Sequence, residues 1–116
     1  MAPADRSATQ VVQDHLNAVL SLDPAGMAAD YATDAILERP DRSWRGQAEI
    51  SAYFATVPAR LGGGRVEFGD FDPDRLEVRW RLVGGPGNGL RGCDRYEVRA
   101  GCIVRQQVRL EGDADF

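Results

Sequence analysis

A single carboxylate, Asp94, occupies a position where a β-strand should present apolar side chains to a core. The segment Gly89–Arg99 alternates as a strand does, with successive side chains on opposite faces, so that Asp94 shares the inward face with Tyr96 and Val98. A buried carboxylate either finds hydrogen-bond donors or has its pKa raised until it stays neutral. Such a group can exchange protons near pH 7, so Asp94 is the first candidate for catalysis.

The only histidine of the chain is the second candidate. His15 lies on the apolar stripe of a predicted helix, one turn from Val11 and one turn from Val19. An imidazole titrates near neutrality and could donate or accept a proton. The alternative is a core histidine that is satisfied by a hydrogen bond, and the sequence leaves both readings open.

Two further polar side chains are expected to face the same interior. The alternation of Ala35, Leu37 and Arg39 places the guanidinium with the apolar set. An inward Arg39 would either bind a substrate carboxylate or enolate, or pair with Asp94. Gln106 faces inward by alternation in the last predicted strand and is a fourth candidate.

The four polar side chains would be positioned by helices in the first half of the chain and strands in the second half. Apolar residues at three- and four-residue spacing, together with capping signals, predict helices over Arg6–Leu22, Pro24–Tyr31 and Gln47–Ala59. Between the second and third lie a short extended segment and a loop, Ala35–Arg39 and Pro40–Gly46. Period-two alternation predicts the strands Arg65–Phe71, Arg75–Val83, Gly89–Arg99 and Cys102–Leu110. In the last strand the inward residues are expected to be Cys102, Val104, Gln106, Val108 and Leu110. This order indicates an α+β fold with helices on one face of a curved antiparallel sheet.

Length and composition bound the protein further. A chain of 116 residues predicts one domain over 1–116, and 43% hydrophobic with 28% charged residues is typical of soluble globular proteins. No apolar run approaches the ~20 residues that span a bilayer, and no signal-peptide pattern is present, so we expect a cytoplasmic protein without a membrane partner. The net charge of −4 argues against nucleic-acid binding.

Neither a disulfide nor a metal site is expected. Cys93 and Cys102 flank a hairpin turn without facing each other, which indicates two free thiols. One histidine does not complete a metal site with them. The outward face of the strands carries seven arginines among glutamates, which indicates a solvated face or a dimer contact with ion pairs: Arg79, Arg81, Arg91, Arg95, Arg99, Arg105 and Arg109.

Three strings carry a resemblance to a known superfamily. They are V-V-Q-D-H-L-N-A-V-L-S-L-D-P-A-G-M from Val11, Y-A-T-D-A-I-L-E-R-P from Tyr31 and W-R-G-Q-A-E-I-S-A-Y-F from Trp44. Over nearly its whole length the chain resembles ketosteroid isomerases, SnoaL-like polyketide cyclases and nuclear-transport-factor-two-like proteins. The resemblance implies a cystatin-like α+β barrel, in which a cone-shaped antiparallel sheet and three N-terminal helices enclose a cavity. It also implies a small hydrophobic ligand, no cofactor and a homodimer.

The resemblance assigns roles to the polar candidates. Ketosteroid isomerases use an aspartate base with a tyrosine and a protonated aspartate as oxyanion hole. The tyrosine position falls on His15, the base position on Arg39 and the protonated aspartate position on Asp94. Arginine stays protonated and is not a general base, so the steroid-isomerase mechanism does not transfer as it stands.

Two functions of different kinds follow. In the first, His15, Asp94 and Arg39 perform isomerisation, cyclisation or dehydration of a small hydrophobic carbonyl compound without a cofactor. In the second, a module with the same fold binds a small molecule or dimerises without chemistry, and Asp94 pairs with Arg39. In both, the ligand is expected to contact a set of cavity residues: Trp44, Phe54, Trp80, Tyr96 and Gln106.

Overall fold

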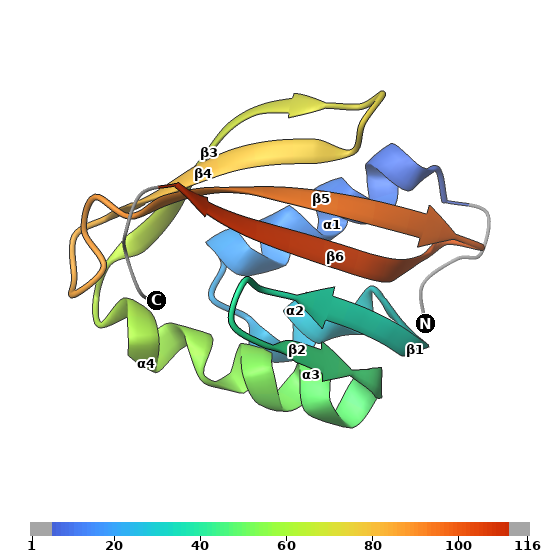
Figure 1. Ribbon diagram of the computed structural model, residues 1–116, viewed down its shortest axis with the longest axis horizontal. Coiled ribbons are helices and arrows are strands. Elements are labelled where there is room, and N and C mark those ends of the chain that lie inside the picture. The colour runs from blue at the N-terminus through green and yellow to red at the C-terminus, as the bar shows by residue number, and fades with distance from the viewer. Residues whose placement is uncertain (1–5, 112–116) are drawn as a thin grey trace.

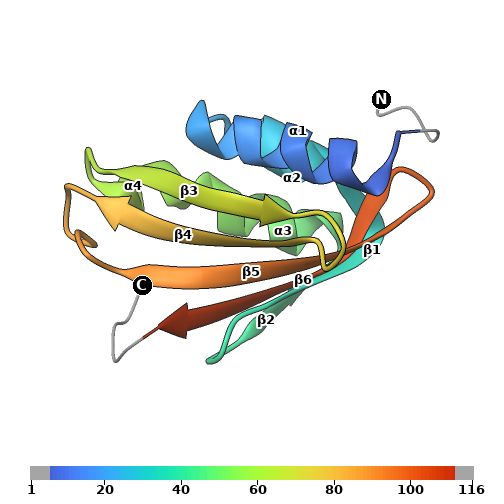
Figure 2. The same ribbon diagram turned by 90° about the horizontal axis from the view of Figure 1, so that it is seen from above.

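The computed structural model describes residues 6–111. Six strands form one curved sheet that does not close on itself, in the order β2-β1-β6-β5-β4-β3. The strands are β1 (Tyr31–Glu38), β2 (Ser43–Arg45), β3 (Arg65–Asp72), β4 (Glu77–Val83), β5 (Arg91–Arg99) and β6 (Cys102–Glu111). The predicted α+β class is confirmed, with helices on one side of the sheet (Figures 1 and 2).

The sheet is antiparallel except at one pairing. β3, β4, β5 and β6 form an antiparallel meander, whereas β1 runs parallel to β6. The antiparallel run of the four predicted strands is confirmed, whereas the segment predicted only as extended, Ala35–Arg39, overlaps β1 and pairs in parallel with β6. In the chain, two helices and four strands separate β1 from β6, and β1 enters the sheet beside this last strand.

The helices differ from the prediction at their ends. They are α1 (Ala8–Leu20), α2 (Pro24–Ala29), α3 (Gly46–Ala55) and α4 (Val57–Leu61). The single helix expected over Gln47–Ala59 is broken at Thr56 because Pro58 sits in the first turn of α4, where proline is tolerated. The second helix ends before Tyr31, which instead begins β1 and pairs with Ile103.

An irregularity in the last hairpin changes which side chains point inward. The register of β5 and β6 shifts between Glu97 and Val98, so that Ile103 rather than Cys102 or Val104 is fully buried. A bulge of this kind opposes two residues to one and reverses the alternation beyond it. Gln106 lies on the other side of the bulge and is buried as expected.

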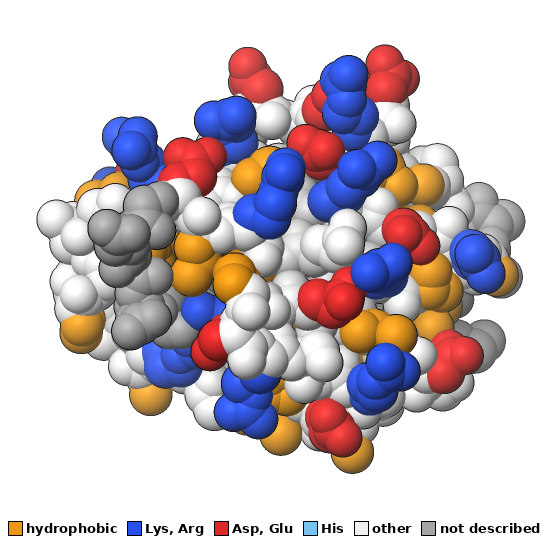
Figure 3. Space-filling view, viewed as in Figure 1, with side chains coloured by type: hydrophobic (Ala, Val, Ile, Leu, Met, Phe, Trp, Pro, Cys, Tyr) orange, Lys and Arg blue, Asp and Glu red, His pale blue; other side chains and the backbone are white. Residues whose placement is uncertain are grey.

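The outer sheet face carries mixed charges, as Figure 3 shows from the sheet side. Glu67 accepts from both Arg65 and Arg81, and Arg79 pairs with Glu111, all at exposed or half-exposed positions. Water and salt screen such exposed pairs, so they contribute little to stability. The homodimer stays a prediction, and so does the choice between a solvated surface and a dimer contact for this face. Cys93 and Cys102 are free cysteines, as expected.

Candidate functional site

A pocket lies between the sheet and the helices. Its volume is about 80 Å³, and its lining comes from all four helices, the end of β1 and strands β3 to β6. His15, Arg39 and Asp94 all line it, as do four of the five residues predicted to contact a ligand: Phe54, Trp80, Tyr96 and Gln106. The remaining lining is almost entirely apolar: Val19, Met27, Tyr53, Val57, Leu61, Val66, Phe68, Leu82, Val108 and Leu110.

Asp94 is buried in this pocket, with 8% of its surface exposed, and three neutral donors hold its carboxylate. The indole Nε1–H of Trp80 donates to Oδ1 at 2.9 Å. The side-chain amide of Gln106 donates to Oδ2 at 3.1 Å, and the hydroxyl of Tyr96 donates to the same oxygen at 3.4 Å. Each donor lies on the strand of Asp94 or on a strand next to it, so the sheet fixes the arrangement.

The backbone makes room for the indole donor. Trp80 on β4 is opposite Gly92 on β5, two residues from Asp94. A Cβ at Gly92 would lie 2.4 Å from the Cζ2 atom of Trp80. Any larger residue at this position would therefore displace the ring that bonds to Asp94.

Burial raises the pKa of Asp94 to about 6, against an ordinary value of 3.8. The hydrogen bonds from Trp80, Gln106 and Tyr96 and the charge of Arg39 oppose this rise. The carboxylate is consequently mostly ionised at pH 7 but still able to take up a proton. Burial raises the pKa of the Tyr96 hydroxyl well above its ordinary range, so this group stays a donor.

A chain of polar groups links Asp94 to His15 without direct contact between them. Gln106 donates to Asp94 through its amide nitrogen and accepts from the Tyr31 hydroxyl at its amide oxygen. The same hydroxyl oxygen lies 3.5 Å from Nε2 of His15. Burial raises the pKa of Tyr31 well above its ordinary range, so its hydroxyl keeps its proton. Tyr31 therefore fixes which end of the Gln106 amide faces Asp94.

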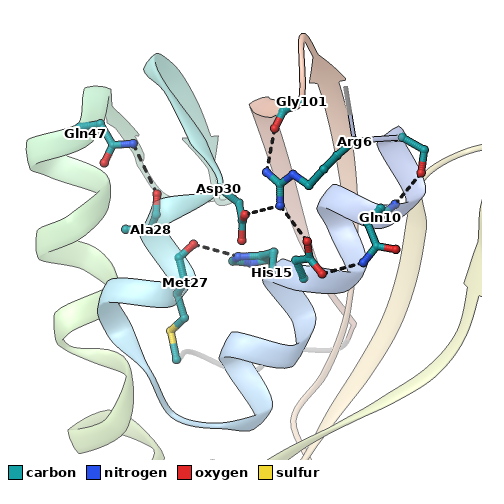
Figure 4. Close-up of polar contacts among 10 residues, drawn as sticks. Arg6, Gln10, His15, Met27, Ala28, Asp30, Gln47 and Gly101 are labelled. Carbon is teal, nitrogen blue, oxygen red and sulfur yellow. Dashed lines mark hydrogen bonds and ion pairs between the residues drawn. The ribbon is translucent and has the colours of Figure 1, made fainter. Parts of the chain in front are cut away.

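His15 is held from its other side by the backbone of α2. Its Nδ1 lies 2.9 Å from the carbonyl oxygen of Met27, as Figure 4 shows, so this nitrogen carries the proton and donates it. His15 is 1% exposed, and burial lowers its pKa to about 4. The ring is therefore neutral at pH 7, with Nε2 directed toward Tyr31.

Arg39 follows β1 directly and is 7% exposed, so the alternation that placed it inward is confirmed. Its Nε lies 3.9 Å from Oδ1 of Asp41, a carboxylate at the surface. Its charge also reaches Asp94, whose pKa it helps to lower. A fixed positive charge thus stands at the edge of a pocket that contains one titratable carboxylate.

Trp44 lies outside the lining of this pocket, which departs from the prediction. The segment expected to be a loop contains β2, and the Trp44 ring packs on Tyr53 with centroids 4.4 Å apart. Tyr53 lines the pocket in its place. The loop prediction gave Trp44 no defined direction, whereas pairing of β2 with β1 sets one.

Tyr31 is the site residue that the sequence reasoning missed. It is the last residue of the predicted helix Pro24–Tyr31, whereas α2 ends at Ala29. Read as the first residue of a strand, it has the same parity as Ala35, Leu37 and Arg39 and falls on the inner face. Thr33 has the same parity but is exposed, and the pairing of β1 with β6 is irregular between Tyr31 and Ile36, so alternation alone does not predict this position.

The described residues offer no obvious metal site. Within residues 6–111 no three His, Cys, Asp or Glu side chains gather closely enough to hold a metal ion. Over the same residues, no helix is long and apolar enough to cross a membrane.

Comparisons with known proteins agree with this architecture. The model of the SnoaL-like domain matches residues 12–106. Solved structures of similar fold include an NTF2-like protein of unknown function from Mesorhizobium loti, at 19% identity over 92% of this chain and 96% of that one, with a TM-score of 0.75. A search of curated proteins finds no significant match.

Two further structures carry functional names. A candidate polyketide cyclase from Sinorhizobium meliloti is 20% identical over 94% of this chain and all of that one, with a TM-score of 0.71. A candidate isomerase of the SnoaL-like family from Agrobacterium tumefaciens is 19% identical over 90% and 97% of the two chains, with a TM-score of 0.70. At these identities the likeness concerns the fold alone.

Proposed function

Because this chain belongs to the SnoaL-like domain family, whose fold hosts isomerases and cyclases, we propose that it is a cofactor-independent acid–base enzyme. Asp94 removes a proton from carbon beside the carbonyl of a small hydrophobic molecule. Isomerisation, aldol-type cyclisation and dehydration all begin with this step, so the proposal names the step and not the product.

One observation carries the proposal: a buried carboxylate faces an apolar pocket with a pKa of about 6. A general base works best when its pKa lies near the working pH. The three neutral donors hold the carboxylate in one orientation without adding a charge that would make it a weak base. Structural carboxylates, in contrast, are commonly paired with a cation.

The remaining groups have roles that suit this step. Removing the proton leaves negative charge on the carbonyl oxygen, and a fixed cation near that oxygen stabilises it. Arg39 lines the pocket and supplies that charge. His15 is neutral and buried and packs edge-on against the Tyr31 ring, with centroids 5.3 Å apart, so in this proposal it positions Tyr31 by packing and does not exchange protons with the substrate.

The test is exchange of hydrogen for deuterium at the carbon beside the carbonyl of small cyclic enones, followed by NMR in D₂O. The wild-type rate should rise with pH through about 6 and then level off, because the base acts when ionised. Asp94→Asn should lose about 10²–10⁴ of the catalysed rate, the usual contribution of a general base.

A matched variant separates the base from a general change of charge. Asp70 lies exposed on β3, so Asp70→Asn should keep the full rate. Circular dichroism must show that Asp94→Asn is folded. Full exchange by folded Asp94→Asn would contradict the proposal.

The second candidate, a small-molecule-binding module without turnover, has one observation in its favour. The pocket volume of about 80 Å³ is well below the ~300–1,000 Å³ of most ligand sites. A pocket of this size suits a small ring or short chain, which could simply be held. Binding of an enone by the wild type with no exchange above the buffer rate would favour this candidate.

A further inference from the structure

The two oxygens of the Asp94 carboxylate have unequal surroundings. Within residues 6–111, Oδ2 accepts two hydrogen bonds, from the Gln106 amide at 3.1 Å and from the Tyr96 hydroxyl at 3.4 Å. Oδ1 accepts one, from the Trp80 indole at 2.9 Å. Each oxygen of an ionised carboxylate has two lone pairs. The contacts of the described residues therefore occupy both lone pairs of Oδ2 and leave one lone pair of Oδ1 open.

The pocket around Asp94 also has two unequal sides. On the side of Oδ2, Gln106 and Tyr96 are 4% and 2% exposed, and the Gln106 amide oxygen accepts from the Tyr31 hydroxyl. On the side of Oδ1, Trp80 is half-buried and lines the pocket. Polar groups that bond to one another thus occupy the Oδ2 side, whereas the Oδ1 side adjoins the apolar part of the pocket.

The apolar side chains on the Oδ1 side come from one row across the sheet. Phe68 pairs with Trp80, Trp80 with Gly92, and Gly92 with Leu110. Phe68, Trp80 and Leu110 line the pocket and are half-buried. Gly92 leaves the space in which the indole lies, since a Cβ there would come within 2.4 Å of Cζ2 of Trp80. The row is thus an apolar wall whose side chains carry one polar group, the Nε1–H that donates to Oδ1.

We propose that Oδ1 is the oxygen of Asp94 that removes the proton, and that Trp80 is the positioning residue that holds this oxygen toward the substrate. The inference rests on the proposed function, because it names the reacting atom of that step. The C–H proton moves to Oδ1, the electron pair of the broken bond passes into the enolate, and Asp94 becomes neutral. The apolar part of the substrate then lies against Phe68, Trp80 and Leu110.

The hydrogen bond from Trp80 fixes the plane of the carboxylate. Rotation about χ2 of an aspartate has broad preferences, so bonds to Oδ2 alone leave Oδ1 free to move. A bond of 2.9 Å to Oδ1 opposes this rotation. A displacement of about 1 Å in a catalytic site can cost on the order of a hundredfold in rate. The same bond stabilises the ionised form and helps to lower the pKa of Asp94, so Trp80 makes this residue a weaker base in a fixed orientation.

Removal of the indole N–H tests the positioning role. Trp80→Phe keeps an aromatic ring in the wall but deletes the donor to Oδ1. The pKa of Asp94, read from its ¹³C carboxyl titration, should rise above about 6, because a hydrogen bond that lowers it is lost. The plateau rate of deuterium exchange should nevertheless fall about tenfold or more, since the carboxylate can rotate. Trp44→Phe, the same substitution outside the pocket lining, should change neither quantity.

Two results with the folded Trp80→Phe variant would overturn the inference. An exchange plateau equal to that of the wild type would show that Trp80 does not position the base. A lower plateau with an unmoved titration of Asp94 would show that the loss is a general structural effect, because a role through the hydrogen bond must move both quantities. Circular dichroism confirms that the variant is folded.

A crystal structure of the wild type soaked with 2-cyclopentenone tests the choice of oxygen without any substitution. The saturated carbon beside the carbonyl should lie within about 3.5 Å of Oδ1, a separation typical of reacting atoms. A position nearer to Oδ2, or an enone outside the pocket, would overturn the inference.

The complex requires no turnover, so the two proposals can fail separately. Exchange that depends on Asp94, with the enone carbon at Oδ2, removes only the present inference. An enone carbon at Oδ1 without any exchange above the buffer rate removes only the proposed function.

Discussion

Two buried aspartates of this protein are held in opposite ways. Asp30, at the end of α2, accepts from Nη1 of Arg6 at 2.8 Å, and both side chains are about nine-tenths buried. Among residues 6–111, the donors to Asp94 are the neutral groups of Trp80, Gln106 and Tyr96. A directly bonded guanidinium stabilises the ionised form of a carboxyl more strongly than neutral donors do, and at Asp94 burial outweighs the three hydrogen bonds and the charge of Arg39.

The Arg6 contacts and the pocket of Asp94 involve two consecutive residues of α1. Asp14 accepts from Arg6 at 2.8 Å, and the next residue, His15, faces the pocket. Arg6 also donates to the carbonyl oxygen of Gly101, so it joins α1, α2 and the turn between β5 and β6 (Figure 4). A buried carboxylate is thus a candidate base when its hydrogen bonds come from neutral groups, even though the charge of Arg39 also reaches Asp94.

The largest predicted effect breaks the Arg6 arrangement. Arg6→Ala leaves Asp30 buried without its cation, and removal of one partner from a buried pair costs about 3–5 kcal/mol of folding free energy. Urea denaturation at pH 7 measures this loss. Arg79→Ala, which breaks an exposed pair with Glu111, should cost less than about 1 kcal/mol.

A second substitution checks the cause of that loss. In an Arg6→Ala, Asp30→Asn double variant the unpaired charge is gone, so part of the stability should return. If the double variant is no more stable than Arg6→Ala alone, then Arg6 stabilises the fold through Asp14 and Gly101 and not through the charge of Asp30.

The next prediction concerns pH and Asp94. Because its pKa is about 6 in the folded protein and about 4 when unfolded, the folded state holds a proton that the unfolded chain releases between these values. The contribution of Asp94 to stability is therefore greatest below pH 4 and is lost as the pH rises to about 6. A shift of about two units corresponds to about 3 kcal/mol.

The variant Asp94→Asn isolates this pH-dependent contribution of Asp94 to the free energy of unfolding. Measured by urea denaturation at several pH values, the stability of the wild type should fall relative to the variant by on the order of 2–3 kcal/mol between pH 4 and pH 7. The matched variant Asp70→Asn changes an exposed carboxylate and should follow the wild type without this divergence. Parallel curves for the wild type and Asp94→Asn would mean that burial does not perturb Asp94 as described.

Local periodicity was sufficient to place the polar side chains of regular strands. Asp94, Gln106 and Arg39 all face inward as their alternation predicts, because one face of each strand is buried. Periodicity fails where regularity ends. Because of the bulge opposite Glu97 and Val98, the core contains Ile103 and not Val104. Trp44 lies on the short strand β2 and does not line the pocket.

Contacts between distant residues could not be predicted in this way. The partners of Arg6 lie 24 and 95 residues away, so no local pattern carries the pair with Asp30. Tyr31 was missed for a different reason. The predicted helix extends two residues too far, so Tyr31 was assigned to a helix although it begins a strand. Both cases concern how side chains are held in place, which depends on tertiary packing more than on pattern.

The smallest predicted effect tests whether Tyr31 sets the surroundings of Asp94. Tyr31→Phe leaves the amide oxygen of Gln106 without its donor, at a cost of about 1–2 kcal/mol, and frees the amide to turn. A turned amide would present oxygen to Asp94 in place of an N–H group, so the pKa of Asp94, read from its ¹³C carboxyl titration, should rise above about 6. Tyr53→Phe removes a hydroxyl from the same pocket and should leave that titration in place. If Tyr31→Phe loses stability while the titration of Asp94 does not move, Tyr31 is only a packing residue, and neutral donors alone account for the difference between the two aspartates.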